Sequence, residues 1–298
     1  MTGTTLRSGF VCLVGRPNVG KSTLLNALVG RPVSITARKP QTTRNRIVGV
    51  KHGPGYQVVL VDTPGIHQAA APLNVRMVRY AMAALAEADI VLVIVEPGPE
   101  PTQEDHLVLE RVREAAPLAF LLINKIDTAS EATILRSLQT YGALGIFEEV
   151  VPVSAVTGKG LKRLERLIVA RLRPGPPYFE PEQATDQSET MIIAELVRQE
   201  LFRRTHQEVP YKSAVRVEHL EDKPGRLVID ARIFVERDSQ KGIVIGKGGR
   251  MLKAIGTAAR AKIEALLGVR VYLGLQVTVL AGWSENPRYL AELGYPES

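Results

Sequence analysis

The stretch Gly15-Arg-Pro-Asn-Val-Gly-Lys-Ser22 constrains the fold of this chain more than any other. It matches the pattern G-x-x-x-x-G-K-[ST] of a phosphate-binding loop. An apolar run over 10–14, typical of a buried strand, precedes it, and a helical pattern over 23–29 follows it and ends at Gly30. In such a unit the glycines let the backbone wrap around phosphate oxygens, and the helix start directs N–H groups at them. The stretch therefore predicts an α/β fold that binds a nucleotide.

Each residue type in the loop predicts a separate contact. Lys21 is expected to reach the β- and γ-phosphates, and the Ser22 hydroxyl to ligate Mg²⁺. Further phosphate contacts are expected from Gly15, Asn18, Val19, Gly20 and Thr23. The alternative is a glycine-rich turn that matches by chance. With glycine at about 7% of residues, such a match is expected in about one chain in a hundred of this length.

The composition is that of a globular protein without disulfides. The chain has 298 residues, enough for two domains with separate cores. Its one cysteine, Cys12, lies in an apolar run and is expected to fill the core, which suits a reducing cytoplasm. No apolar run approaches the roughly 18 residues of a membrane span, and the first residues lack the pattern of a signal peptide. The net charge of +7 indicates a polyanionic partner.

Strands and helices alternate through the first half of the chain. Continuous apolar runs over 89–95 and 118–123 are typical of parallel strands covered on both faces. Runs over 47–51 and 57–61, joined by a Gly-Pro-Gly turn, predict an antiparallel hairpin. This order predicts a doubly wound α/β domain with a mostly parallel sheet over residues 1–172.

Polar motifs follow the predicted strands of this domain. They are Gly15–Ser22, Asp62–Gly65, Asn124–Asp127 and Ser154–Ala155. Because the carboxyl ends of parallel strands line one crevice of an open sheet, these motifs are expected to meet there. Four separated motifs therefore converge on one nucleotide.

This order of motifs resembles that of the translation-factor-like GTPases, and Lys39-Pro-Gln-Thr-Thr-Arg-Asn-Arg46 resembles the first switch of the Era family. The resemblance implies that the Asp127 carboxylate accepts hydrogen bonds from guanine N1–H and the N2 amino group. A wrong base would leave this carboxylate unpaired, so the pairing discriminates strongly. The rest of the guanine site would be formed by Asn124, Lys125, Ser154 and Ala155.

The resemblance also implies a magnesium site and two switch loops. Asp62 would hold Mg²⁺ through water, and the Gly65 N–H would sense the γ-phosphate. One of Thr42 and Thr43 would close over Mg²⁺ in the GTP state. The family pattern favours Thr43, although the sequence alone does not determine which of these two adjacent hydroxyls contacts Mg²⁺. Loss of the γ-phosphate would release both loops.

The residue after Asp62–Gly65 is Ile66, where Ras-like enzymes have a glutamine that orients the attacking water. Isoleucine offers no polar group for this role, so slow intrinsic hydrolysis of GTP is expected. The neighbouring His67 is a candidate base, but a solvated loop histidine is the favoured interpretation. In related loops that contain asparagine at the position of Asn18, this residue ligates K⁺. The hypothesis is that K⁺ at Asn18 takes the place of an arginine finger.

A proline-dense stretch over 173–186 predicts a semi-rigid linker, and a second domain is expected over 187–298. Helical periodicity over 189–204 is followed by two alternating strands, a glycine loop that opens a helix, and an alternating strand over 269–279. This order resembles an α+β type II KH domain of bacterial RNA-binding proteins.

The motif Gly246-Lys-Gly-Gly249 carries the chemistry of this second domain. Gly142–Gly145 also matches G-x-x-G but contains no basic residue, whereas seven cations and one carboxylate lie between 237 and 263. The predicted function is to clamp the backbone of single-stranded RNA, and the alternative is a solvated helix face after a glycine turn. The expected RNA contacts are Ile245, Gly246, Lys247, Gly248, Gly249, Arg250 and Lys253, with Ile243 and Leu252 as further groove residues.

Across nearly the whole chain the sequence resembles the Era family. The resemblance implies a GTP-binding and GTP-hydrolysing switch that binds the 3′ region of 16S rRNA, acts in assembly of the small ribosomal subunit, and is a cytoplasmic monomer. One alternative is a growth or cell-cycle signalling GTPase, peripheral on the inner face of the cell membrane, with secondary RNA contact. Another is an RNA-dependent ATPase or kinase, against which Asn124–Asp127 argues.

Overall fold

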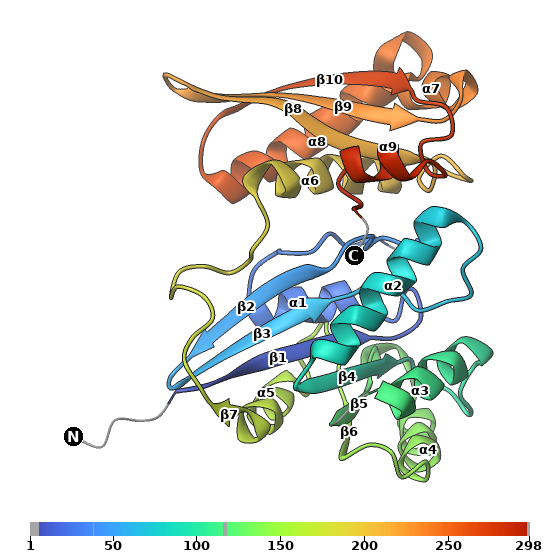
Figure 1. The fold of residues 1–298 in the computed structure, drawn as a ribbon, viewed down its shortest axis with the longest axis vertical. Coiled ribbons are helices and arrows are strands. Elements are labelled where there is room, and N and C mark those ends of the chain that lie inside the picture. The colour runs from blue at the N-terminus through green and yellow to red at the C-terminus, as the bar shows by residue number, and fades with distance from the viewer. Residues whose placement is uncertain (1–5, 38, 116–117, 297–298) are drawn as a thin grey trace. The chain divides into compact units, whose positions relative to one another are not determined.

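The computed structural model describes residues 6–37, 39–115 and 118–296. By their contacts the residues form two compact units (Figure 1). The first contains residues 1–34, 43–69 and 75–186, and the second contains 35–42, 70–74 and 187–298. The loop over 35–42 therefore belongs to the second unit, although the chain on either side of it belongs to the first.

The first unit has a sheet with the strand order β2-β3-β1-β4-β5-β6. All neighbours in this order pair in parallel except β2, which is antiparallel to β3. The strands are β1 (Arg7–Val14), β2 (Ile47–Gly53), β3 (Tyr56–Asp62), β4 (Ile90–Val95), β5 (Ala119–Ile123) and β6 (Glu149–Pro152). The predicted doubly wound, mostly parallel sheet is confirmed.

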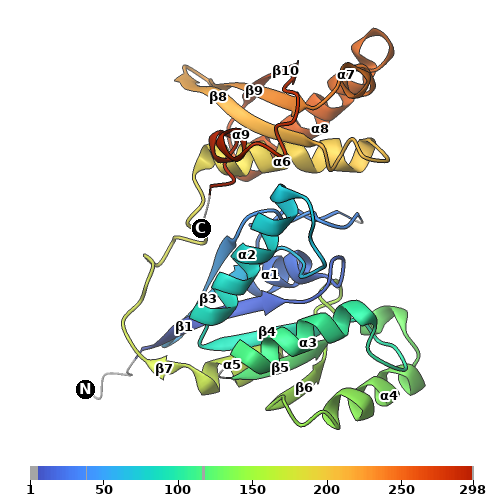
Figure 2. The same cartoon turned by 45° about the vertical axis from the view of Figure 1, so that its right-hand side comes forward.

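Five helices among the described residues of this unit cover both faces of its sheet (Figure 2). Successive residues of β1 point to opposite faces, so Cys12 joins one hydrophobic cluster and Leu13 the other. One cluster contains side chains from α2, α3 and α4, and the other contains side chains from α1 and α5. The helices are α1 (Lys21–Val29), α2 (Pro72–Glu87), α3 (Gln103–Ala115), α4 (Glu131–Gly142) and α5 (Leu161–Arg171). Cys12 is fully buried, as expected.

The proline-dense stretch over 173–186 is bonded along its length to the first unit. Its start forms β7 (Arg173–Pro174), which pairs antiparallel with β1. Gln57 Nε2 donates to Phe179 O (2.8 Å), and Val50 N donates to Ala184 O (2.8 Å). Proline density indicated a semi-rigid segment but gave no sign of β7 or of these bonds. The domain boundary at 186/187 stays a proposal.

The second unit has a three-stranded sheet with the order β10-β9-β8. β10 is parallel to β9, and β8 is antiparallel to it. Helices α6 and α8 pack side by side on one face of this sheet (Figures 1 and 2). The elements are α6 (Glu189–Arg204), β8 (Ser213–Lys223), β9 (Arg226–Val235), α7 (Asp238–Ile245), α8 (Arg250–Leu267), β10 (Val271–Val279) and α9 (Pro287–Glu292).

The helix α7 was not predicted, because Ile243–Ile245 was interpreted only as an apolar run before the glycine loop. The residue that could have predicted this helix is Gln240, near the helix start. Its Oε1 accepts hydrogen bonds from the N–H groups of Glu236 (2.9 Å) and Arg237 (3.2 Å). A glutamine side chain that reaches back in this way satisfies donors that a helix start leaves unpaired.

Candidate functional site

The loop Gly15–Ser22 lies between β1 and α1, and α1 begins at Lys21. Lys21 is buried, and its Nζ donates to Gly15 O (3.0 Å) and Arg16 O (2.9 Å). Burial disfavours the charged amine and lowers the pKa of Lys21 to about 8. The loop therefore folds around its own lysine and holds the ammonium group where phosphate oxygens are expected.

This lowered pKa predicts that nucleotide affinity depends on pH. A phosphate beside Lys21 favours the ammonium form, so binding takes up a proton wherever the free amine is partly neutral. Affinity for GDP is expected to be level below pH 8 and to fall by up to about tenfold per pH unit above it. Because the folded chain holds this proton more weakly than the unfolded chain, Lys21 also makes stability rise with pH above 8. Calorimetry at pH 8.5 in two buffers of different ionisation enthalpy measures the proton uptake, and its absence would contradict the prediction.

Asn124 joins the phosphate loop to the expected base site. Its Nδ2 donates to Val19 O (2.8 Å), and its Oδ1 accepts from Ala155 N (3.0 Å). Gly20 has φ +100°, and a Cβ there would lie 2.4 Å from Asn124 Nδ2. Glycine is therefore required at position 20 by backbone conformation and by the close approach of Asn124.

The buried carboxylate of Asp62 gathers three hydroxyl groups. Its Oδ2 accepts hydrogen bonds from Ser22 Oγ (2.6 Å), Ser34 Oγ (2.8 Å) and Thr43 Oγ1 (3.1 Å). Burial raises the pKa of Asp62, although these bonds and Lys21 oppose the shift. Its Oδ1 is buried and has no hydrogen-bond partner within the described part of the chain. Carboxylate and hydroxyl oxygens are suitable ligands for Mg²⁺, so this donor set fits the ion.

The structure separates the two threonines of the first switch. Thr43 Oγ1 lies 2.8 Å from Ser22 Oγ, whereas Thr42 Oγ1 donates to Lys39 O (2.8 Å). This geometry favours Thr43 as the hydroxyl for Mg²⁺. Ser34 was missed, because a single serine in a polar loop has no sequence signal.

The base-binding motif begins after β5. Lys125 has φ +63°, and its Nζ donates to Asn18 O (2.7 Å). Ser154 Oγ donates to Asp127 Oδ1 (2.5 Å) and accepts from Thr157 N (3.1 Å). Ser154 therefore orients the Asp127 carboxylate, which is otherwise exposed.

The two residues after Asp62–Gly65 both bond to backbone carbonyl groups. Ile66 is buried in the core, and its N–H donates to Gly15 O (3.3 Å). His67, expected to be a solvated loop residue, is half-buried, and its Nδ1 donates to Gly65 O (2.7 Å). Asn18 has φ +67° and an exposed side chain.

The glycine loop of the second unit lies between α7 and α8. Gly246, Gly248 and Gly249 all have positive φ. Beside the loop is a groove of about 350 Å³ between α8 and β10, and it is lined by Gly249, Leu252, Lys253, Gly256, Thr257, Arg260, Leu273 and Leu275. Gly249, Leu252 and Lys253 were predicted for RNA contact. Ile243 and Ile245 lie on α7 and do not line this groove.

Sequence reasoning missed the groove positions Gly256 and Thr257, and it counted Arg260 only among the cations between 237 and 263. The available signal was glycine inside a helical pattern, which costs about 1 kcal/mol relative to alanine and marks a close approach. A Cβ at Gly256 would lie 3.3 Å from Leu275 Cδ1. Glycine therefore keeps the groove open between α8 and β10.

Comparison with known proteins agrees with both halves of this description. The family described as 50S ribosome-binding GTPase matches residues 10–125, and the KH domain family matches 208–284. GTPase Era of Geotalea uraniireducens is 49% identical over 296 residues, which cover 99% of this chain and 100% of the relative. The chain belongs to the Era GTPase family. It is therefore a GTPase with a C-terminal KH domain, as predicted.

Era of Heliobacterium modesticaldum is 44% identical over 293 residues, which cover 98% of each chain. A crystal structure of Era with MgGDPNP and nucleotides 1506–1542 of 16S ribosomal RNA matches at TM-score 0.94 and 36% identity, covering 98% of this chain and 99% of the other. A variant of Aquifex aeolicus Era bound to GDP and AlF4⁻ matches at TM-score 0.93 and 36% identity, covering 98% and 100%.

One further residue of the Era nucleotide site was missed by sequence reasoning. Glu96 follows β4 and accepts hydrogen bonds from Arg16 Nη2 (2.6 Å) and from Lys125 Nζ. Burial alone would raise the pKa of Glu96, but Lys125 and Arg16 outweigh burial and lower it. One carboxylate therefore joins Arg16 of the phosphate loop to Lys125 of the expected base site.

Replacing Glu96 by glutamine is expected to weaken GDP binding by about tenfold, since hydrogen bonds to charged groups contribute about 1.5–3 kcal/mol. Glu96 acts through Lys125 and Arg16 and not on the base edge, so IDP binding should weaken by the same factor. Competition with a fluorescent nucleotide measures both affinities, with exposed Glu100→Gln as the matched control. If the Glu96→Gln and Glu100→Gln variants bound GDP with equal affinity, this role of Glu96 would be contradicted. It would also be contradicted if Glu96→Gln weakened the binding of GDP but not of IDP.

Proposed function

We propose that this Era GTPase is a nucleotide-controlled switch that binds the 3′ region of 16S rRNA through its KH groove and acts in assembly of the small ribosomal subunit. The observation that carries the proposal is the groove of about 350 Å³ between α8 and β10, beside the basic glycine loop. The solved complex of another Era with nucleotides 1506–1542 of 16S rRNA supports the same RNA partner for the protein described here. The proposal implies a cytoplasmic protein, and we propose that it acts as a monomer.

The proposed nucleotide site follows from the contacts around the loop. Lys21 and the N–H groups at the start of α1 would stabilise charge on the phosphates, which is the main task in phosphoryl transfer. Ser22, Thr43 and Asp62 would hold Mg²⁺, which offsets phosphate charge. The other phosphate contacts are Gly15, Asn18, Val19, Gly20, Thr23 and Gly65. The guanine contacts are Asn124, Lys125, Asp127, Ser154 and Ala155.

The alternative of a signalling GTPase at the membrane has less support. No helix in residues 6–37, 39–115 or 118–296 is long and apolar enough to span a bilayer. A peripheral contact would use basic surface together with an amphipathic anchor. The glycine-loop cations instead adjoin a groove between a helix and a strand edge, an arrangement that suits RNA.

The proposal is tested by crosslinking the full-length protein to small ribosomal subunits with GTP or GDP bound. Crosslinks from residues of the α8–β10 groove to the 3′ region of 16S rRNA are expected, with a yield that differs between the two nucleotides. Crosslinks that lie elsewhere on the rRNA, or a yield that is the same with either nucleotide, would contradict the proposal.

The hypothesis that K⁺ binds at Asn18 also has a direct test. Replacing K⁺ by Na⁺ is expected to slow GTP hydrolysis by about tenfold or more, because the hypothesis gives K⁺ the charge-stabilising role of an arginine finger in the transition state. Asn18→Ala should hydrolyse GTP at the slow rate in both salts. Measurement of phosphate release checks this, with GDP affinity in each salt as the control. If the unmodified protein hydrolysed GTP at the same rate in K⁺ and in Na⁺, the hypothesis that K⁺ binds at Asn18 would be wrong.

A further inference from the structure

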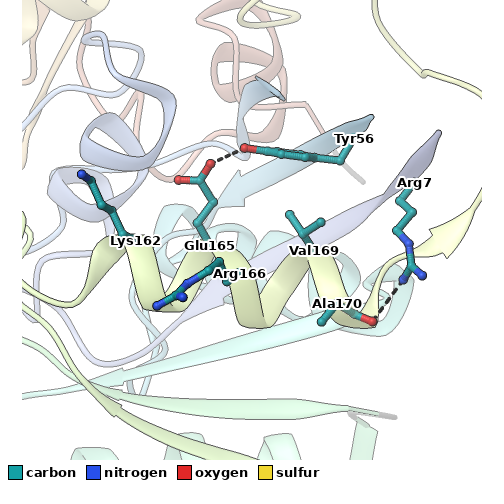
Figure 3. Close-up of a pocket in the computed structure, with 7 residues that line it drawn as sticks. All are labelled: Arg7, Tyr56, Lys162, Glu165, Arg166, Val169 and Ala170. Carbon is teal, nitrogen blue, oxygen red and sulfur yellow. Dashed lines mark hydrogen bonds between the residues drawn. The ribbon is translucent and has the colours of Figure 1, made fainter. Parts of the chain in front are cut away.

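A second groove lies on the first unit, and none of its lining residues, labelled in Figure 3, belongs to a motif of the nucleotide site. Its volume is about 1010 Å³, and residues of α5 form one side. Arg7 of β1 and Tyr56 of β3 form the other side. All of its lining residues belong to the first unit.

Three of the seven residues that line this groove are cations, and one is a carboxylate. Lys162 and Arg166 are exposed and one helical turn apart on α5, and neither has an ion pair or hydrogen bond within the described residues. Arg7 Nη1 donates to Ala170 O (3.2 Å) and Leu172 O (3.1 Å), so its charge lies at the C-terminal end of α5. Three lining residues are therefore cationic, and two of them are free to contact a ligand.

The carboxylate in the groove is already engaged. Glu165 accepts a hydrogen bond from the Tyr56 hydroxyl, and Figure 3 shows the two side chains pointing toward each other. Burial and this contact raise the pKa of Tyr56 to about 12, so the hydroxyl stays a donor at neutral pH. Glu165 therefore does not pair with Lys162 or Arg166.

The surrounding chain adds to the positive charge. Residues 159–173 contain six lysine or arginine residues and one carboxylate, which is Glu165. Arg171 pairs with Glu148, and Arg163 lies 3.7 Å from Glu149. The remaining cations of this stretch are Lys159, Lys162, Arg166 and Arg173.

We propose that this α5 groove binds the phosphate backbone of ribosomal RNA outside the segment held by the KH groove. The inference rests on the proposed function, which makes RNA the polyanionic partner. Two cations one helical turn apart can contact phosphates without reading the sequence, which is the usual role of lysine and arginine in nucleic-acid binding. The lining contains one large aliphatic side chain, half-buried Val169, so it offers no large exposed aliphatic residue of the kind that anchors a protein in a membrane.

The test compares a short RNA of the 16S 3′ end with the whole small subunit as ligands of the full-length protein. Lys162→Ala/Arg166→Ala is expected to bind the short RNA as the unmodified protein does, and to bind the subunit about tenfold more weakly. Loss of two phosphate contacts should reduce the slope of log affinity against log salt concentration by about 1.4 to 1.8. The matched control is Arg113→Ala/Arg136→Ala, which removes two exposed cations of α3 and α4. Thermal unfolding checks the fold of each variant.

The outcomes separate this inference from the proposed function. The Lys162→Ala/Arg166→Ala variant could bind the subunit with unchanged affinity and salt slope while the unmodified protein still binds it. This result would overturn the proposal for the α5 groove and leave the proposed function in place. Failure of the unmodified protein to bind subunits would overturn both. Loss of binding to phosphatidylglycerol vesicles, with subunit binding intact, would make a membrane the ligand and overturn the inference.

Discussion

Replacing Asp127 by asparagine is expected to weaken binding of GTP and GDP by about a thousandfold or more, since a site built to pair with a polar group discriminates by about 10⁴–10⁵. The carboxylate would accept from guanine N1–H and the N2 amino group, and an amide presents a donor in place of one acceptor. The same change should improve binding of xanthine nucleotides, because xanthine carries a carbonyl where guanine carries the amino group. Ser154 Oγ, which donates to Asp127 Oδ1 (2.5 Å), can still donate to the amide oxygen.

Competition with a fluorescent nucleotide measures the affinities for GDP and XDP. Glu131→Gln is the matched control, because this exposed carboxylate lies at the start of α4, four residues from Asp127. An Asp127→Asn protein that binds GDP normally would show that the base is read elsewhere. Loss of both nucleotides without any gain for XDP would point to collapse of the loop.

Replacing Gly248 by aspartate is expected to weaken binding of the 16S 3′ fragment by about a hundredfold. The added carboxylate would repel the RNA backbone and offset the charge of one neighbouring cation, which should reduce the salt dependence as well. Gly248 has φ +60° and no atom within 4 Å of a Cβ built there. Aspartate tolerates this conformation better than most residues, so the effect should be electrostatic and not steric.

Gly225→Asp is the matched control for this change. Gly225 also has a positive φ (+77°) and open space around its Cβ position, but it lies in the turn between β8 and β9. Fluorescence anisotropy with labelled RNA measures both affinities, and thermal unfolding reports any strain. If the two aspartate variants bound RNA equally well, the glycine loop would not be the clamp.

The sequence was sufficient where a short motif determines a local structure. The motif Gly15–Ser22 predicted a strand before the loop and a helix after it, and the structure has β1 and α1 at these two places. The helix over Glu189–Arg204 was predicted to the residue, because the spacing of its apolar positions is a local signal. The same reasoning placed Asp62 and Asn124 at strand ends, which brought them into one site.

The sequence was insufficient where a role depends on contacts between distant segments. Glu96 lies 80 residues from Arg16 and 29 from Lys125, and its role follows from their hydrogen bonds to it. Ser34 is similar, because Asn26 holds it against Asp62. In the KH half, the apolar residues Ile243 and Ile245 were chosen by proximity to the glycine loop. The groove instead runs along α8 and the edge of β10.

Because Gly20 and Asn124 are in close contact, the residues tolerated at one of these positions depend on the residue at the other. A methyl group at position 20 would lie 2.4 Å from Asn124 Nδ2 and would force the asparagine from both of its hydrogen bonds. A larger residue at position 20 would therefore disturb the base site as well as the phosphate loop. A shorter side chain at position 124 would restore room, but it would leave the strained backbone at position 20, where φ is +100°. The mutational histories of these two positions should be correlated, not independent.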